Sequence, residues 1–396
     1  MVVTVSIEQQ YTRTPDGQIW SPQFGYAFWA RYLDIFDEVR VIARVRQMDS
    51  VPNIWQRADG PGVSFESIPY YVGPWQFLKK FWAVRSAVRN ALQDHSAVIM
   101  RLDSQLAAFL FPLMVKSRRP YGAEVVVDPH DVFAPGSGHP FRPYFRWKFS
   151  RQLRMQCAEA SAVAFVTECA LQQRYPASKA SFTTHYSSVE LSSDSFISQP
   201  RLNFGVDGKF RIVSVGSMAD LRKSQDVLID AMAQCTTDGL NLELHLVGEG
   251  RYRSVLEERV RARGLTGRVV FLGQLSAGDV RAQLDQADLF VLVSRAEGLP
   301  RAAIEAMARG LPTIGSLVGG FPEIISREYL VPPGDVPALV RSIKAMLSST
   351  HSMAALSCRN IHRASDFHDE RLGARRREFY LHVRKQTEVW LQNRSS

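Results

Sequence analysis

Two glutamates, Glu297 and Glu305, stand eight positions apart in the stretch SRAEGLPRAAIEAMARG (294–310), whose other positions are mostly small and apolar. Pro300 is well placed in a first helical turn, because proline lacks an N–H that would be unpaired there anyway. Gly310, followed by Leu-Pro, is a typical end for such a helix. The stretch therefore predicts a short, buried helix that starts near Pro300.

A carboxylate at Glu305 on that helix would be expensive to bury unless hydrogen-bond partners or a shifted pKa compensated for the charge. Arg301 and Arg309 lie four residues to either side on the same helix face and could pair with it. A ligand that offers hydroxyl groups could pair with it equally well. The residue types alone leave both possibilities open.

Four further loops in the second half of the chain carry glycine or charge directly after a β-branched run, so five such strand ends are predicted in all. Glycine permits close approach of a backbone to a ligand, and Lys or Arg at the start of a helix attracts phosphate. Each loop alone would be explained as a tight turn or a solvated basic turn, but together they predict a ligand-binding edge. The positions are Gly216, Ser217, Arg222 and Lys223; Gly248 and Gly250; Phe271 and Gly273; and Gly319, Gly320 and Glu323.

Short β-branched runs alternate with helical patterns through both halves, which predicts parallel sheets with helices on both faces. A Ser-rich segment that ends in Pro separates the halves. We therefore predict an α/β protein of two doubly wound, Rossmann-like domains that face each other across a cleft, with the ligand at the carboxyl ends of the strands. The predicted boundaries are 1–188 and 208–369 for the domains, 189–207 for the linker, and 370–396 for a basic helix that packs back on the first domain.

The composition excludes several classes of protein. The 396 residues are 45% hydrophobic, and the net charge of +9 is spread over both halves without a basic tail or a nucleic-acid recognition motif. A basic balance still favours anionic partners such as phosphates or a lipid surface. The four cysteines form no C-x-x-C pair, which is typical of a reducing compartment, and no apolar run approaches the roughly 20 residues of a spanning helix. We expect a cytoplasmic protein, soluble or peripheral at the inner face of a membrane.

The motifs of the second half resemble glycosyltransferase family 4, retaining nucleotide-sugar enzymes of the GT-B fold. The likeness runs from Phe210 to Leu347 through VGS, RKSxD, VGEG, VFLGQL, EGLPxxxIEAMAxGxP with its E-x(7)-E spacing, GGFPEII and VPPGD. The first half resembles the family only in general plan, as expected where acceptors vary.

The resemblance implies roles for the charged residues of these loops. Glu305 would bind the ribose hydroxyls of a nucleotide-sugar, Glu297 would bind the donor sugar, and Lys223 would neutralise the diphosphate. Backbone N–H groups at the helix start would face sugar or phosphate. The expected donor-binding set is Gly216, Ser217, Arg222, Lys223, Gly248, Gly250, Phe271, Gly273, Glu297, Gly298, Leu299, Pro300 and Glu305.

Two positions depart from the family pattern. Ser217 stands where Arg is common, and Ser224 stands where Gly is common. Arg222 could supply the missing cation, in which case Arg222→Ala would weaken nucleoside diphosphate binding.

In the first half, VVVDPHDVFAPGSG predicts a strand over Val125–Val127 that ends in Asp128, His130 and Asp131 before a Pro/Gly loop. The family commonly has a histidine near this strand end, beside the transferred sugar, and His130 is the nearest match. A structural histidine is the alternative. Asp128 and Asp131 could bind acceptor hydroxyls or cap the turn.

A loop from Tyr11 to Gly25 is predicted after the first strand, and it should face the cleft as acceptor surface. Asp16, Gly17 and Trp20 are its candidate acceptor-binding residues. The same residue types would also serve any long surface loop.

Two aromatic and basic stretches remain, at Trp75–Trp82 and Phe141–Arg154. In the second, Phe145, Phe149 and Leu153 recur at helical spacing and predict a stripe that faces the core. The cations between them have no acidic residue among them. They could form a solvated face or a dock for anionic lipid.

These features predict a retaining glycosyltransferase that moves a sugar from a UDP-sugar or GDP-sugar to a glycan or lipid-linked acceptor in surface polysaccharide assembly. His130, Glu297 and Lys223 are its expected catalytic residues. The chain contains no D-x-D sequence, so we expect Lys223, Arg222 and helix-start N–H groups to stabilise the leaving diphosphate without a metal or a cofactor. The alternative is a non-catalytic nucleotide-sugar sensor or scaffold of the same fold. Nucleic acid is not an expected partner.

Overall fold

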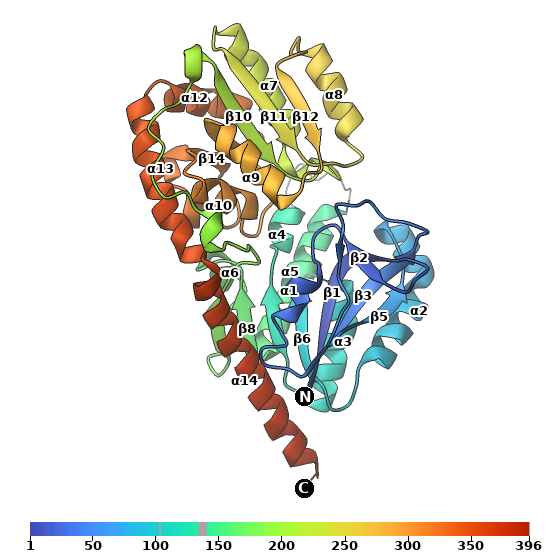
Figure 1. The fold of residues 1–396 in the computed structure, drawn as a ribbon. Coiled ribbons are helices and arrows are strands. Elements are labelled where there is room, and N and C mark those ends of the chain that lie inside the picture. Colours follow the sequence, from blue (N-terminus) through green and yellow to red (C-terminus); the bar gives the residue numbers. More distant parts are fainter. Residues whose placement is uncertain (103, 134–140, 396) are drawn as a thin grey trace.

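The computed structural model describes residues 1–102, 104–133 and 141–395, which form two α/β units stacked along one axis (Figure 1). The first unit contains a nine-stranded sheet and the second a six-stranded sheet. The Pro/Gly loop predicted after His130 falls on residues 134–140, outside the described residues.

In the first sheet the strand order runs outward from β1 in both directions. Seven parallel strands follow the order β5-β3-β1-β6-β7-β8-β9, and two short strands, β2 and β4, extend β1 in antiparallel pairing. The strands β6, β7 and β8 are buried along their whole length, as expected for parallel strands covered on both faces. Their bounds are β1 Val2–Arg13, β2 Ile19–Ser21, β3 Glu38–Gln47, β4 Gln56–Arg57, β5 Val63–Pro69, β6 Ala97–Leu102, β7 Gly122–Val125, β8 Ala162–Phe165 and β9 Phe182–His185.

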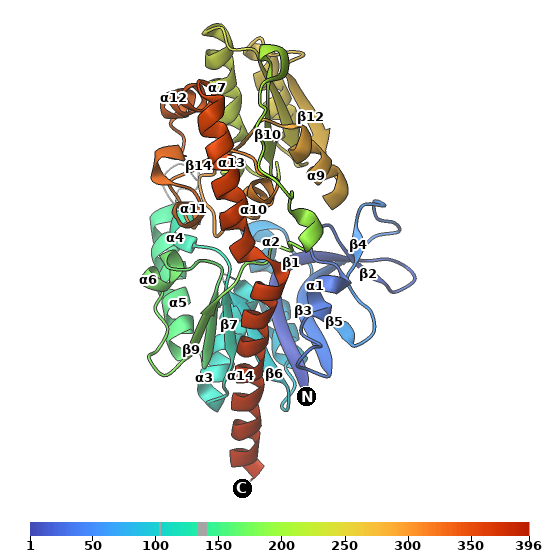
Figure 2. The ribbon, with the colours of Figure 1, turned by 60° about the vertical axis from the view of Figure 1, so that its left-hand side comes forward.

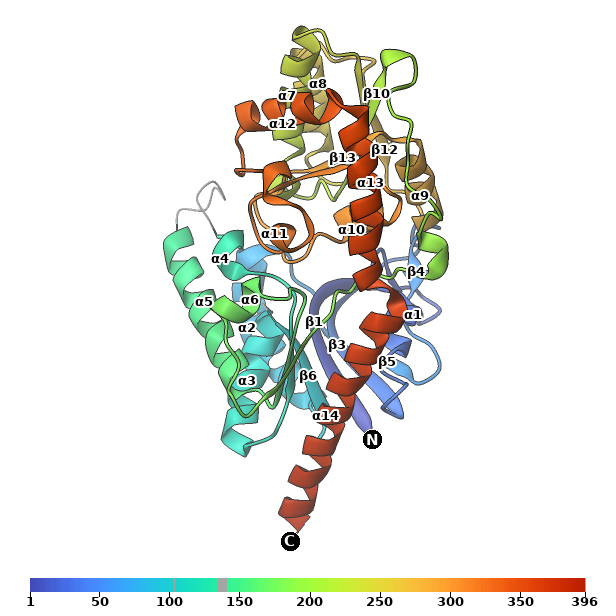
Figure 3. The ribbon, with the colours of Figure 1, turned by 90° about the vertical axis from the view of Figure 1, so that its left-hand side faces the viewer.

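Helices cover both faces of this sheet. On one face lie α2 (Gly73–Ala91), α3 (Gln105–Ser117) and α5 (Arg142–Glu159), and on the other lie α1 (Tyr26–Ala30) and the long α14 (Asp369–Ser395) (Figure 3). Two short helices, α4 (Pro129–Val132) and α6 (Ala170–Arg174), follow β7 and β8 at the end nearer the second unit.

The second sheet repeats the same winding with parallel strands only, in the order β12-β11-β10-β13-β14-β15. Order reverses at β10, and in such sheets ligands bind beyond the carboxyl ends of the strands at that point. The strand bounds are β10 Phe210–Val215, β11 Leu242–Val247, β12 Val269–Gly273, β13 Leu289–Leu292, β14 Thr313–Ser316 and β15 Leu330–Val331. The helices are α7 Gln225–Thr237, α8 Arg253–Ala262, α9 Ala277–Gln286, α10 Arg301–Ala308, α11 Phe321–Ile324, α12 Val336–Leu347 and α13 Thr350–Ala364.

The chain crosses between the two units twice. The segment predicted as a linker, 189–207, contains only short 3-10 turns, at Ser193–Ser195 and Val206–Gly208. The second crossing joins α13 to α14, which runs down the first unit as one column (Figure 2). A side chain at Gly122 of β7 would collide with Val383 and Phe379 of α14, so the helix packs directly on the first sheet. The C-terminal helix therefore does pack back on the first unit.

Two predictions about local structure are wrong. The strand predicted over Val125–Val127 is β7, which spans Gly122–Val125 and stops earlier because Asp128 already caps the following helix, α4. The loop predicted from Tyr11 to Gly25 is largely a hairpin, since β1 continues through Arg13 and pairs with β2. No helix in the described residues is both long and apolar enough to cross a membrane.

Candidate functional site

Lys223 and Glu297 meet between the first and fourth strand ends of the second sheet. The Nζ atom of Lys223 lies 2.9 and 2.7 Å from the two carboxylate oxygens of Glu297. Their side chains are 27% and 11% exposed, so the pair is reachable from solvent but largely screened from it. The lysine predicted to bind diphosphate and the glutamate predicted to bind sugar thus share one site.

An arginine that the sequence did not single out holds these two loops together. Arg295 makes a bidentate ion pair with Asp226 at the start of α7, with distances of 2.9 and 2.7 Å. It also donates to the carbonyl of Leu221, and its backbone N–H donates to the carbonyl of Arg222. The loop that carries Lys223 is therefore fixed against the loop that carries Glu297. Arg295 lies two residues before Glu297, which is the only signal in the sequence that could have pointed to it.

The glycines Gly248 and Gly250 serve the contact between two loops of the chain itself. A Cβ at Gly248 would lie 2.1 Å from the carbonyl oxygen of Gly216, and one at Gly250 would lie 2.1 Å from the backbone of Met218 and Ala219. Both have positive φ, at 135° and 158°. We predicted close approach to a ligand at these glycines, but the close approach in the structure is to residues 216–219.

The remaining glycines of the donor set shape the same edge. Gly319 has a φ of 51°, and a Cβ there would lie 2.1 Å from the carbonyl oxygen of Glu297. The N–H of Gly320 donates to the carbonyl of Gly298 at 2.7 Å. Gly273, with φ of 71°, faces the carboxylate of Glu249. The loop after β14 therefore packs against the loop that carries Glu297 and supports it.

Arg222 and Ser217 do not reach the Lys223–Glu297 pair in the described contacts. Arg222 is 54% exposed and pairs with Asp220 at 2.8 Å. Burial alone would raise the pKa of Asp220, but the hydrogen bond and charge of Arg222 outweigh it and lower that pKa. The hydroxyl of Ser217 accepts from the N–H of Ala219. Arg222 is thus a partly neutralised cation in this structure.

Glu305 is a carboxylate for which the described residues offer no hydrogen-bond partner. It lies on α10, only partly exposed, and accepts no hydrogen bond from any described residue. Burial raises its pKa, while the charge of Arg301 acts in the opposite direction. Arg309, the other candidate partner, pairs instead with Asp285 at 2.7 and 2.8 Å.

The other predicted donor residues surround these groups. Phe271 in β12 lies 5.8 Å below the guanidinium of Arg253. Pro300 is the N-cap of α10, and Leu299 is 7% exposed. A Cβ at Gly298 would lie 2.2 Å from the carbonyl oxygen of Val126, which follows β7 in the first unit. The carboxyl ends of the two sheets are therefore in direct contact at Gly298.

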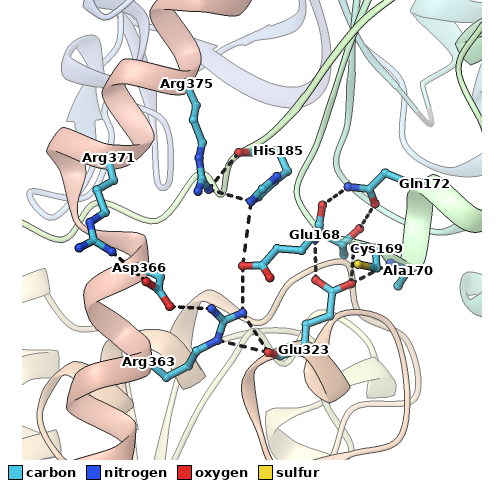
Figure 4. A network of polar contacts seen from close by, with 11 residues as sticks. Glu168, Cys169, Ala170, Gln172, His185, Glu323, Arg363, Asp366, Arg371 and Arg375 are labelled. Atoms are coloured by element: carbon cyan, nitrogen blue, oxygen red, sulfur yellow. Dashed lines mark hydrogen bonds and ion pairs between the residues drawn. The ribbon is translucent and has the colours of Figure 1, made fainter. Parts of the chain in front are cut away.

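Glu323 joins the two units on the far side of this contact. Its carboxylate accepts hydrogen bonds from the backbone N–H groups of Glu168, Cys169 and Ala170, at 2.6, 3.0 and 2.7 Å (Figure 4). Arg363 of α13 bridges Glu168 and Asp366 beside it, at 2.9 and 2.7 Å. Glu323 was recognised as a strand-end residue, but its role as a cap for α6 depends on the packing of the two units.

Asp128, His130 and Asp131 lie together on α4. Asp128 is 3% exposed, caps α4 through the N–H of His130, and accepts from Tyr175 and Arg174. Asp131 lies 3.1 Å from Nδ1 of His130 and 3.2 Å from Arg174. The capping alternative therefore holds for Asp128, whereas the His130 side chain is 37% exposed.

The three residues of α4 also offer ligand atoms within 4.8 Å of one another, a spacing that a metal ion could use. The cations already present oppose that use, because Arg174 pairs with both carboxylates and Arg146 contacts the His130 ring. In this cluster both carboxylates are paired with a cation, and the imidazole of His130 is the group that solvent reaches.

The residues predicted in the first loop form a self-contained hairpin turn. Thr14 donates to the carboxylate of Asp16 at 2.5 Å, and the indole N–H of Trp20 donates to Thr14 at 3.1 Å. Gly17 has a φ of 84°, which a tight turn favours. Nearby Phe24 does contact the second unit, since the guanidinium of Arg301 lies 5.7 Å from its ring. Asp16, Gly17 and Trp20 are thus each hydrogen-bonded to Thr14, and no described contact joins them to His130.

Comparison with known proteins assigns these features to a class. Residues 209–349 match the family described as "Glycosyl transferases group 1". The chain is similar to Protein CapJ of Staphylococcus aureus, with 25% identity over 367 residues that cover 92% of each chain. It is also similar to the Putative colanic acid biosynthesis glycosyltransferase WcaL of Escherichia coli K12, with 32% identity over 143 residues, 34% of this chain and 35% of that one.

Among solved structures, that of Anabaena Alr3699/HepE in complex with UDP and glucose has a TM-score of 0.65 and 20% identity, and covers 96% of this chain and 98% of its own. This likeness shows the fold, which is GT-B. The fold is therefore GT-B, and residues 209–349 are similar to the group 1 glycosyltransferases, as the resemblance in the sequence predicted.

Proposed function

We propose that this protein transfers a sugar, with retention at the anomeric carbon, from a UDP-sugar or GDP-sugar to a glycan or lipid-linked glycan acceptor. The observation that carries the proposal is the Lys223–Glu297 ion pair on the same edge as the unpartnered Glu305. A vicinal diol supplies two hydroxyl donors, which is what a half-buried carboxylate without partners requires. The similarity to WcaL supports a place in surface polysaccharide assembly.

The chemistry follows from where charge develops. The acceptor oxygen bonds to the anomeric carbon, the bond from that carbon to the diphosphate oxygen breaks, and the diphosphate leaves with the electron pair. In front-face retention the proton of the acceptor hydroxyl passes to the departing phosphate oxygen. Lys223 and the N–H groups at the start of α10 stabilise the growing negative charge, so the step needs neither a metal nor a cofactor.

Two residues complete the proposed catalytic set. Glu297, released from Lys223 when the diphosphate binds, accepts from hydroxyls of the donor sugar. His130 faces the transferred sugar from the first unit, because α4 follows directly after the Val126 contact with Gly298. Asp131 and the other residues of α4 line the acceptor side.

Calorimetric titration with UDP, GDP and ADP tests the donor site. We expect one nucleotide to bind wild-type protein and to bind Glu305→Ala at least about tenfold more weakly, the cost of losing a charged hydrogen-bond acceptor. NMR of the product of the full reaction then reads the anomeric configuration. Absence of binding by all three nucleotides, or an inverted product, would contradict the proposal.

We further propose that the protein works at the inner, cytoplasmic face of a membrane. Exposed aromatic and apolar side chains lie on α2 and at the start of α5, namely Trp75, Leu78, Trp82, Phe141, Tyr144 and Trp147. Such side chains next to Lys79, Lys80 and the arginines of α5 suit an anionic lipid surface. Sedimentation with anionic vesicles should exceed that with neutral vesicles, and no difference would remove this part of the proposal.

A further inference from the structure

A surface groove of about 810 Å³ lies between α4 and α5 of the first unit. Its floor is one face of α5, where two adjacent rows at four-residue spacing both face the groove: 142, 146, 150 and 154, and 143, 147, 151 and 155. His130 and Phe133 form its other wall. At a rise of about 1.5 Å per residue, these rows span about 20 Å. The groove is therefore long enough for an extended ligand.

The groove has a strong positive charge. Arg142, Arg146, Arg151 and Arg154 all line it, and within the described residues no carboxylate pairs with any of them. The nearest acidic groups, on α4, are already paired with Arg174. The Nε atom of Arg146 is buried without a partner, and its Nη2 lies 3.0 Å from Nδ1 of His130. Arg154 donates to the carbonyl of Arg174 at 3.3 and 3.1 Å. Guanidinium groups that no described carboxylate neutralises fit the oxygens of a phosphate or diphosphate.

The same groove is apolar between these charges. Trp147, Met155 and Phe133 line it, and Trp147 is 61% exposed. The ring of Phe133 stacks on Phe149 at 5.5 Å, which fixes the apolar wall. A groove with arginines and a free indole suits an anion attached to a hydrocarbon chain better than a free anion.

One end of the groove lies on the side of the second unit. His130 lines the groove, and α5 runs from the side of the second unit towards the far end of the first (Figure 3). Asp128, three residues after Val125, is the N-cap of α4, and the carbonyl of Val126 lies against Gly298 of the donor loop. A ligand in the groove could therefore present its free end to the transferred sugar.

We propose that this groove binds the phosphate or diphosphate of a lipid-linked acceptor, with its hydrocarbon chain along α5 and its sugar end at His130. The role as acceptor site rests on the proposed function, whereas binding of the anionic lipid does not. Geranyl diphosphate is a suitable probe because it carries both groups and stays soluble as a monomer.

The test is calorimetric titration of geranyl diphosphate into wild-type protein and Arg142→Gln/Arg151→Gln. We expect the double variant to bind at least about tenfold more weakly, since each charge-assisted hydrogen bond to phosphate is a strong one. Arg341→Gln, an exposed arginine on α12 at the opposite end of the molecule, is the matched control and should bind as wild type does. Geraniol and inorganic pyrophosphate should each bind at least about tenfold more weakly than geranyl diphosphate.

Lys223→Gln separates this groove from the donor site, where a diphosphate could also bind. Loss of geranyl diphosphate binding in Lys223→Gln, with the double arginine variant unaffected, would place the ligand in the donor site and overturn the inference. If geraniol bound as tightly as geranyl diphosphate, the groove would not recognise the diphosphate. If pyrophosphate bound as tightly, the groove would not recognise the hydrocarbon chain. If the groove binds geranyl diphosphate but the protein binds neither UDP nor GDP, the inference about the groove is supported and the proposed function is contradicted.

Discussion

The two units have the same winding but hold their charges differently. In the second, ionic groups sit in loops at the strand ends, as with Lys223–Glu297 and Arg295–Asp226. In the first, the ion pair Arg101–Glu124 lies inside the sheet on β6 and β7, with side chains 8% and 3% exposed. The second unit therefore places these ion pairs at its strand ends, whereas the first places one within its core.

The buried pair of the first unit is part of a larger polar cluster. Glu124 accepts hydrogen bonds from the hydroxyls of Tyr32 and Tyr186, and Tyr32 stacks on Tyr380 of α14 at 4.4 Å. Burial favours neutral forms, but attraction to Glu124 outweighs it and raises the pKa of Arg101. The cluster thus links β6, β7 and the C-terminal helix. Five changes test the difference between the two units.

The largest effect should come from breaking the buried pair. Arg101→Met leaves Glu124 buried without its cation and should lower the free energy of unfolding by about 3–5 kcal/mol. Urea denaturation measures this, with Arg261→Gln as control, because Arg261 pairs with the exposed Glu258 and should cost at most about 1 kcal/mol. Similar losses in both variants would mean that the internal pair is no more important than a surface one.

Lys223→Gln should act on binding and not on folding. Removing one charge-assisted contact to the diphosphate should weaken nucleotide binding by about 1.5–3 kcal/mol, measured by calorimetry. Lys344→Gln, which breaks an ion pair with Asp238, is the matched control and should bind normally. Wild-type affinity in Lys223→Gln would show that the ion pair with Glu297 is structural.

Arg295→Lys should reveal whether loop positioning matters at the donor site. Lysine cannot reproduce the bidentate pair with Asp226 together with the bond to Leu221, so donor KM should rise by about fivefold to tenfold. Arg259→Lys removes a similar pair, with Asp230, between α8 and α7, and should leave KM unchanged. An equal rise in both would indicate general loosening of the unit.

Glu305→Gln should change how the free energy of unfolding depends on pH. The raised pKa of Glu305 means that the folded protein binds this proton more tightly than the unfolded chain. The free energy of unfolding should then fall as pH rises from the ordinary carboxyl pKa of 4.5 towards the raised value, and the variant should lose that fall. Urea melts across this range measure it, with the exposed Glu378→Gln as control. An unchanged pH profile would show that Glu305 is solvated.

Arg222→Ala should have the smallest effect. Because Arg222 is exposed and paired with Asp220, its loss should change nucleotide affinity by less than about 1 kcal/mol, well below the effect of Lys223→Gln. An equal effect in calorimetry would show that Arg222 leaves Asp220 when the diphosphate binds, as the sequence pattern first suggested.

The difference between the units also explains which parts the sequence could predict. The strand ends of the second unit lie in consecutive motifs, so Glu297 and Glu305 could be singled out by type and spacing. The roles expected for them and for Lys223 came from the resemblance to a known family. Arg101 and Glu124 are 23 positions apart, and Tyr380 is far from both, so no local pattern joins them. The glycines illustrate a middle case. Close approach of a group to the backbone was predicted at Gly248 and Gly250, but not that this group would be residues 216–219 of the same chain.

The sequence by itself determined the alternation of strands and helices and the two doubly wound units, because periodicity and turn chemistry act over a few residues. Only the tertiary structure decided that Arg309 pairs with Asp285, that Glu323 caps a helix of the other unit, and that four arginines of α5 share one groove. These depend on which surfaces meet when the sheets pack. A charge is neutralised by whatever group lies within a few ångströms, and the order of residues along the chain does not specify that neighbour.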